Sequence, residues 1–174
     1  MKVFSRRLKI KVMFDQEMIK LNRIVYLLQR SRKVFIVGHV SPDGDAVGSM
    51  LALKLALEKK NKEVVLALDD QVPKYLMFLP GSRAIRSLPE VYKMALSAEL
   101  VVSLDSATYE RTGLHNYFVN PSFHPKFINI DHHHDNPEYG TLNYIKADSS
   151  STSEIIYHIL PRLAAEINPQ VATC

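Results

Sequence analysis

The sequence has 174 residues, of which 47% are hydrophobic and 23% charged, as is typical of one globular domain with a substantial core. Its formal net charge of +4 is compatible with an anionic substrate but does not by itself indicate nucleic-acid binding. No apolar run approaches the roughly 20 residues that a membrane span needs. The basic residues 1–14 lack the apolar stretch of a signal peptide. With Cys174 as its single cysteine, the sequence predicts a cytoplasmic protein without an internal disulfide.

Hydrophobic patterning divides the sequence into a basic N-terminal extension, residues 1–14, and one domain, residues 15–174. Within the domain, helices alternate with short apolar strands, which predicts an α/β fold: a doubly wound, mostly parallel sheet with helices on both faces. Glu154 follows Ser151 by three residues, the pattern of a capping box, and marks the start of the last helix. The expected helices cover residues 15–30, 46–59, 73–79, 91–97 and 151–163, and the expected strands cover residues 34–37, 64–68, 100–104, 127–130 and, at an edge, 142–145.

Polar residues follow three of these strands directly. His39 comes after the first strand, Asp105 after the third and Asp131 after the fourth. In an open parallel sheet, ligands bind outside the carboxyl ends of the strands. We therefore expect these three residues to lie close together in space, although they are far apart in the chain.

The loop after the first strand carries three candidate ligands within seven residues: His39, Asp43 and Asp45. Pro42 fixes one backbone dihedral angle, and Gly44 permits the sharp turn that lets both carboxylates face one point. Each element also has an ordinary explanation. Asp residues cap helices, Ser-Pro-Asp-Gly is common turn chemistry, and histidine runs on a surface can be incidental.

Taken together, the elements favour a metal site. Carboxylates gathered with the imidazoles of Asp131-His132-His133 at one sheet edge would repel one another without a cation between them. The donors are oxygen and nitrogen, and no thiolate is among them. This donor set favours Mn²⁺, or else Mg²⁺ or Co²⁺, over structural zinc.

The ordered set of motifs resembles the DHH phosphoesterase family, and its branch of nano-RNases and 3′-phosphoadenosine 5′-phosphate (pAp) phosphatases. The resemblance rests on the H-x-x-x-D-x-D loop of residues 39–45, on Asp105 and on the Asp131-His132-His133 run. Residues 136–140 (Asn-Pro-Glu-Tyr-Gly) and 150–157 (Ser-Ser-Thr-Ser-Glu-Ile-Ile-Tyr) carry it further. It covers the sequence from about residue 20 to residue 174.

The resemblance implies a role for each matching residue. His39, Asp43 and Asp105 would hold one Mn²⁺, and Asp45, Asp105 and His132 would hold a second, with Asp105 bridging the two. His133 would face the substrate phosphate, and Asp131 would orient its neighbours. Two ions sharing a hydroxide would attack phosphorus in very short RNAs, as a 3′–5′ exoribonuclease on nanoRNA, or in pAp.

The family also has a further acidic ligand and a C-terminal substrate-binding domain, and neither is found before Cys174. The resemblance therefore implies a catalytic domain that is incomplete at its C-terminus. The partners expected are short single-stranded RNA or pAp, and either a second copy of the chain or a separate polypeptide that supplies the missing domain.

Three other functions stay open. A manganese pyrophosphatase or a cyclic-dinucleotide phosphodiesterase would share the same motifs, although Asn136 and the Ser-Ser-Thr-x-Glu segment argue against the pyrophosphatase. The non-enzymatic alternative is a remnant, or half of a split protein, that binds metal or nucleotide without turnover. Tyr109, Tyr117 and Phe118 are interpreted as packing residues rather than as platforms for bases.

Overall fold

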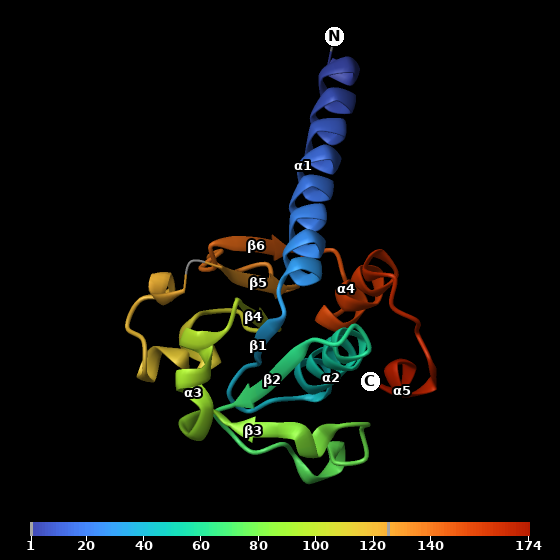
Figure 1. The fold of residues 1–174 in the computed structure, drawn as a ribbon. Helices are drawn as coiled ribbons and strands as arrows, with labels where there is room; N and C mark the ends of the chain where they lie inside the picture. Colours follow the sequence, from blue (N-terminus) through green and yellow to red (C-terminus); the bar gives the residue numbers. More distant parts are fainter. Residues whose placement is uncertain (1, 125) are drawn as a thin grey trace.

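The computed structural model describes residues 16–124 and 126–174 with their side chains, and residues 2–15 only as part of the backbone of the first helix. A six-stranded sheet forms its centre, with helices on both faces (Figure 1). The strand order is β3-β2-β1-β4-β5-β6, and every pairing within the sheet is parallel. The strands are β1 (Lys33–Val37), β2 (Glu63–Leu68), β3 (Ile85–Ser87), β4 (Leu100–Leu104), β5 (Phe127–Asp131) and β6 (Leu142–Ile145).

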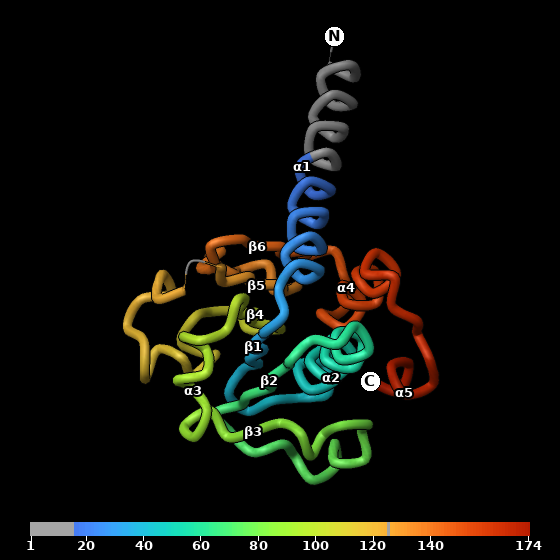
Figure 2. The backbone as a smooth tube through the Cα atoms, in the orientation of Figure 1, coloured from blue at the N-terminus to red at the C-terminus, as the bar shows by residue number. Residues whose placement is uncertain are grey.

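The helices connect these strands in the doubly wound manner expected from the sequence, so the predicted fold class is confirmed. The α-helices are α1 (Lys2–Arg30), α2 (Gly44–Glu58), α3 (Leu88–Ser97), α4 (Thr152–Ile159) and α5 (Pro169–Thr173). Short 3₁₀ turns are η1 (Lys74–Leu76), η2 (Ser82–Ala84), η3 (Glu110–Thr112), η4 (Leu114–Asn116), η5 (Pro121–Phe123) and η6 (Leu160–Leu163). Helix α5 packs beside α2, and the chain ends there (Figure 2).

Two hydrophobic cores lie on the two faces of the sheet, and β1 contributes to both. Val34 and Ile36 point into the larger core, which α1, α2 and α4 cover. Phe35 and Val37 point into the smaller core, beside α3 and the aromatic segment that precedes β5. Successive side chains of a strand point to opposite faces. A strand buried on both faces is therefore apolar throughout, which is why these strands read as continuous apolar runs.

Several details differ from the sequence-based expectation, among them that α1 begins at Lys2 rather than at residue 15 and α2 at Gly44 rather than at residue 46. The short strand β3 was not expected. The helix predicted over residues 73–79 is only a 3₁₀ turn, η1, and Pro80, directly after the segment, disfavours a helical conformation at Leu79. Helix α3 begins three residues early, at Leu88, because Pro89 fits the first turn of a helix. Helix α4 ends at Ile159 and continues as a 3₁₀ turn, because Pro161 has no amide proton to donate.

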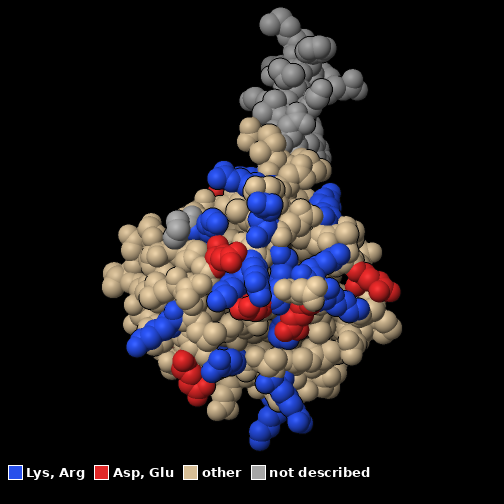
Figure 3. Space-filling model, viewed as in Figure 1, with Lys and Arg blue, Asp and Glu red and all other residues tan. Residues whose placement is uncertain are grey.

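Charge on the surface is mixed. In the view of Figure 3, Lys and Arg side chains are interspersed with Asp and Glu over the middle of the face, consistent with the small net charge of +4. Among the residues that the structure describes, no helix combines the length and apolar character needed to cross a membrane. The predicted basic extension, residues 1–14, lies outside the residues described with their side chains.

Candidate metal centre

His39 lies just beyond the carboxyl end of β1, and its ring orientation is set by the backbone. Its Nδ1 lies 2.7 Å from the carbonyl oxygen of Val40, close enough for Nδ1–H to donate a hydrogen bond. That tautomer leaves a lone pair on Nε2. Nε2 lies 3.8 Å from Asp43 Oδ1 and 3.5 Å from Asp105 Oδ2. The three residues form one compact group able to hold an ion.

Asp43 serves as the N-cap of α2 as well as a member of this group. Its Oδ1 accepts hydrogen bonds from the backbone N–H groups of Asp45 and Ala46, at 2.9 and 3.1 Å. The ordinary explanation of this residue as a helix cap is therefore correct. It does not exclude a second role, because a carboxylate has lone pairs beyond those that the cap uses.

Asp105 is the residue common to both compact groups. It is only 2% exposed and adopts a left-handed backbone conformation, with φ of 56°. Few residues other than glycine adopt this conformation, although Asp tolerates it better than most, and such positions cluster at functional sites. Its carboxylate lies close to His39, in the loop after β1, and to His132 and His133, which follow β5.

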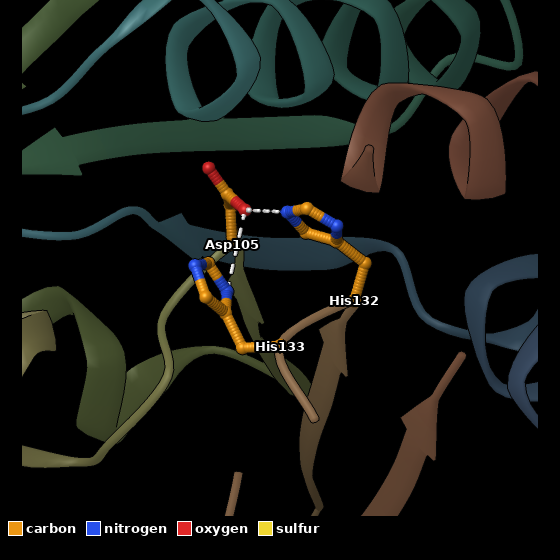
Figure 4. Close-up of side chains that lie close together, drawn as sticks. All are labelled: Asp105, His132 and His133. Carbon is orange, nitrogen blue, oxygen red and sulfur yellow. Dashed lines mark ion pairs between the residues drawn. The ribbon is translucent and has the colours of Figure 1, made fainter. Parts of the chain in front are cut away.

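The second group consists of Asp105, His132 and His133. Figure 4 shows the Asp105 carboxylate directed at both imidazole rings. Asp105 Oδ1 lies 3.6 Å from His132 Nε2 and 3.9 Å from His133 Nδ1. These separations suit donors arranged around a cation rather than donors hydrogen-bonded to one another.

Asp45 lies next to the second group but has additional partners. Its Oδ2 is 3.8 Å from His132 Nε2. Its two carboxylate oxygens also accept the backbone N–H groups of Thr152 and Ser153, both at 2.7 Å, at the start of α4. Asp45 thus ties α2 to α4, a contact that the sequence did not predict. Its predicted role as a metal ligand stays a prediction.

Asp131 holds the histidine run in place. It is fully buried, and its carboxylate accepts hydrogen bonds from the backbone N–H of His132 at 2.8 Å and from Asn136 Nδ2 at 2.7 Å. His133 Nδ1 lies 2.7 Å from the same carboxylate. These contacts are compatible with the orienting role that the family resemblance implied for Asp131, and that role stays a prediction.

The surroundings shift the pKa values of His39, Asp45 and Asp105 in different directions. Burial acts to lower the pKa of His39, but hydrogen bonding to Asp105 and the charges around it outweigh burial and raise that pKa. Burial, together with the charge of Asp105, raises the pKa of Asp45. Burial acts to raise the pKa of Asp105, but the neighbouring His39 and the hydrogen bond from Thr152 outweigh burial and lower that pKa. The carboxylates of Asp45 and Asp105 therefore repel each other, and a cation bound between them would reduce this repulsion.

Three polar residues near the site were given no role in it by the sequence analysis. Thr152 Oγ1 donates to Asp105 Oδ1 at 2.9 Å, and Asn136 contacts Asp131. Arg111 Nη2 lies 3.4 Å from the Val40 carbonyl oxygen. Both Thr152 and Asn136 stand in segments on which the resemblance rested, but nothing in their spacing indicates these contacts.

The family described as "DHH family, N-terminal domain" matches residues 33–174. The bifunctional oligoribonuclease and PAP phosphatase NrnA of Thermus thermophilus is 34% identical over 140 residues, covering 80% of this chain and 40% of that protein. The NrnA of Bacillus subtilis, with the same description, is 35% identical over 122 residues, covering 70% of this chain and 36% of that protein.

A solved structure shows the same fold. The crystal structure of an exopolyphosphatase-related protein from Bacteroides fragilis superimposes with a TM-score of 0.75 at 28% identity. The match covers 84% of this chain and 44% of that one. The chain thus spans about two fifths of the length of the relatives that it matches.

Proposed function

The chain belongs to the DHH family, and from that membership we propose that it carries the catalytic centre of a metal-dependent phosphoester hydrolase. The observation that supports this most is the position of Asp105. One buried carboxylate is shared by two compact groups of oxygen and nitrogen donors at the carboxyl edge of the sheet. A shared carboxylate is the arrangement that a pair of ions needs.

The donors fit Mn²⁺, with Mg²⁺ or Co²⁺ as alternatives. They are carboxylate oxygens and imidazole nitrogens, and the described free cysteine, Cys174, is not among them. We propose that His39, Asp43 and Asp105 hold one ion and that Asp105 and His132 hold the other, with Asp45 as a further ligand. Bound ions would supply Lewis-acid activation of water and neutralise phosphate charge.

The protein groups around these ligands have separate tasks in the proposal. Asp131 binds His133 through Nδ1, which leaves Nε2 of the half-exposed imidazole to meet a phosphate oxygen. Burial acts to lower the pKa of His133, but the Asp131 carboxylate outweighs burial and raises that pKa, so that protonation is easier. His133 is thereby suited to donate a hydrogen bond or a proton to the developing charge.

The substrate class comes from the relatives. Two of them are described as oligoribonuclease and PAP phosphatase, and we propose short RNA oligonucleotides and pAp as substrates here. Cyclic dinucleotides and pyrophosphate are the alternatives within the same chemistry. The chain spans about 40% of the Thermus relative, so the substrates named for that whole protein are proposed, not shown, for this chain. A location in the cytoplasm and a partner that is a second copy or a separate domain are also expectations.

The proposal is tested with the purified chain and Mn²⁺. An RNA dinucleotide, pAp, pyrophosphate and a cyclic dinucleotide are assayed side by side, and Mn²⁺ binding is measured by calorimetry. Asp105→Asn should abolish turnover and binding of both ions, whereas Asp148→Asn, at a side chain 78% exposed and paired with Lys146, should change neither. Metal binding without turnover of any substrate would support the non-enzymatic alternative. Two ions bound to Asp105→Asn would refute the shared ligand.

A further inference from the structure

A cavity of about 420 Å³ lies at the carboxyl end of β2 and along β3, and none of the candidate metal ligands lines it. Its lining includes Asp69 and Asp70, which follow β2, and Ile85–Ser87, which form β3. This volume lies within the range of about 300–1,000 Å³ that small-molecule sites occupy. No step of the proposed hydrolysis uses these residues.

A hydrogen bond joins the cavity to the loop of residues 39–45, which carries candidate metal ligands. Asp70 Oδ2 accepts a hydrogen bond of 2.6 Å from the backbone N–H of Ser41, which lies between His39 and Asp43 in the loop. Ser41 has a φ of 54°, so the loop bends at this contact. A ligand that touches Asp70 is therefore one side chain away from the loop that presents two of the candidate metal ligands.

The lining combines the groups that a nucleotide requires. Val72 and Met77 provide apolar surface for a base, and the carboxylates of Asp69 and Asp70 can accept hydrogen bonds from ribose hydroxyl groups. Arg83 also lines the cavity and can contact phosphate. Across the side chains described, from residue 16 onward and leaving out residue 125, the Arg83 guanidinium enters no ion pair.

The turn at the edge of the cavity also carries two exposed aromatic rings. Tyr75 is 70% exposed and Phe78 is 71% exposed, and they stand on either side of Met77 in the chain. The turn is held by the buried Leu79 and by a hydrogen bond from Ser82 Oγ to the Met77 carbonyl oxygen. Aromatic rings on a fixed turn suit the stacking of unpaired bases.

We propose that this cavity is a nucleoside subsite, which binds the base and ribose of the nucleotide adjacent to the scissile phosphate. The inference rests on the proposed function for its substrate class. It assigns Arg83 and Arg86 to a flanking phosphate, Asp69 and Asp70 to ribose, and the exposed aromatic turn to the neighbouring base.

The test measures binding without metal, so that it does not depend on turnover. The 5′-phosphorylated RNA dinucleotide pApA is titrated by calorimetry in EDTA into the wild-type chain and into the double variant Arg83→Gln/Arg86→Gln. Arg32→Gln is the control for loss of a single surface positive charge, at the amino end of β1, from a side chain 75% exposed. The double variant should weaken the Kd about tenfold or more and Arg32→Gln should leave it unchanged. Pyrophosphate should bind at least about tenfold more weakly than pApA, because it has no base or ribose.

A second arm separates this subsite from the proposed function. Hydrolysis of bis-p-nitrophenyl phosphate with Mn²⁺ needs the metal centre but offers no nucleoside, so the double variant should keep it. Absence of this activity in the wild type would count against the proposed function while the EDTA titration still tests the subsite. An unchanged Kd in the double variant, or pyrophosphate bound as tightly as pApA, would overturn the subsite.

Discussion

Thr152 donates its hydroxyl to Asp105 at 2.9 Å, so the first residue of α4 contacts the carboxylate common to both donor groups. The hydroxyl is buried and cannot exchange this partner for water. The bond also favours the ionised form of Asp105, since it contributes to lowering that pKa. The start of α4 thereby helps to keep the central carboxylate charged.

Replacing Thr152 with valine should therefore destabilise the chain. Thr152→Val keeps the shape of the side chain but removes the hydrogen bond, and we expect the free energy of unfolding to fall by about 1–3 kcal/mol. Urea denaturation in the absence of metal measures the change. Thr173→Val, at an exposed residue of α5, is the control and should stay within about 0.5 kcal/mol of the wild type. Equal stability of Thr152→Val and the wild type would mean that the bond contributes nothing.

Asn136 is expected to stabilise the histidine run through two partners. Its Nδ2 donates to Asp131 Oδ2 at 2.7 Å, and its Oδ1 accepts from Asn129 Nδ2 at 2.9 Å. Asn136→Ala should lower the free energy of unfolding by about 2 kcal/mol, because the buried Asp131 and Asn129 both lose a partner.

Asn136→Asp gives a sharper test of the same contact. It places a second carboxylate against Asp131, so at neutral pH it should destabilise the chain more than Asn136→Ala does. The added penalty should decrease as the pH falls and one of the two carboxylates becomes protonated. Thermal unfolding at neutral and mildly acidic pH measures this. A penalty independent of pH would indicate a steric cause instead.

The sequence was sufficient to predict which residues gather at the sheet edge, but not every contact between them. His39 and Asp105 follow strands and Asp131 is the last residue of one. The carboxyl ends of parallel strands lie at one edge, so the convergence of these residues follows from topology alone. The contact of Asp45 with the start of α4 joins residues 107 and 108 positions apart. It depends on how two helices pack, which local patterns do not specify.

Local context explains the other differences. Strand β3 has three residues, and its pairing with β2, such as Ile85 opposite Leu66, decides its conformation. In the predicted capping box, Ser151 Oγ accepts the backbone N–H of Glu154 as expected, at 3.0 Å. The Glu154 carboxylate instead binds the backbone N–H and the hydroxyl of Ser150, one residue before the N-cap. The capping box is therefore predicted at the correct position, but its second hydrogen bond goes to Ser150 instead of to the N-cap residue Ser151.

Arg111 should influence metal affinity and catalysis in opposite directions. Its guanidinium lies 3.1 Å from His39 Nδ1, beside a candidate ligand. Because Nδ1 most simply donates to the Val40 carbonyl oxygen, the arginine acts on His39 through its charge and through that shared carbonyl group. Arg111→Gln removes a repulsive positive charge, so we expect Mn²⁺ to bind more tightly in calorimetry.

The same substitution removes a cation that could face the phosphate. We expect kcat/KM for pAp to fall about tenfold or more, since charge-assisted contacts to phosphate are among the strongest hydrogen bonds. Arg162→Gln, which removes a positive charge at η6, should change neither quantity. Weaker Mn²⁺ binding in Arg111→Gln would show that the guanidinium supports the orientation of His39 more than it repels the ion.

Glu154 should make a small, pH-dependent contribution to stability. Hydrogen bonds from the backbone and the hydroxyl of Ser150 lower the pKa of Glu154 below its ordinary value of 4.5. A group whose pKa is lowered by folding stabilises the folded state above its unfolded pKa. That stabilisation is lost as the pH falls from 4.5 through the folded pKa. Glu154→Gln should therefore be less stable than the wild type at neutral pH, and the difference should shrink once the carboxyl is protonated. Urea denaturation at about pH 7 and about pH 3 tests this, with Glu138→Gln as the control for an exposed carboxylate. A difference that grew on acidification would mean that Glu154 is bound in its protonated form.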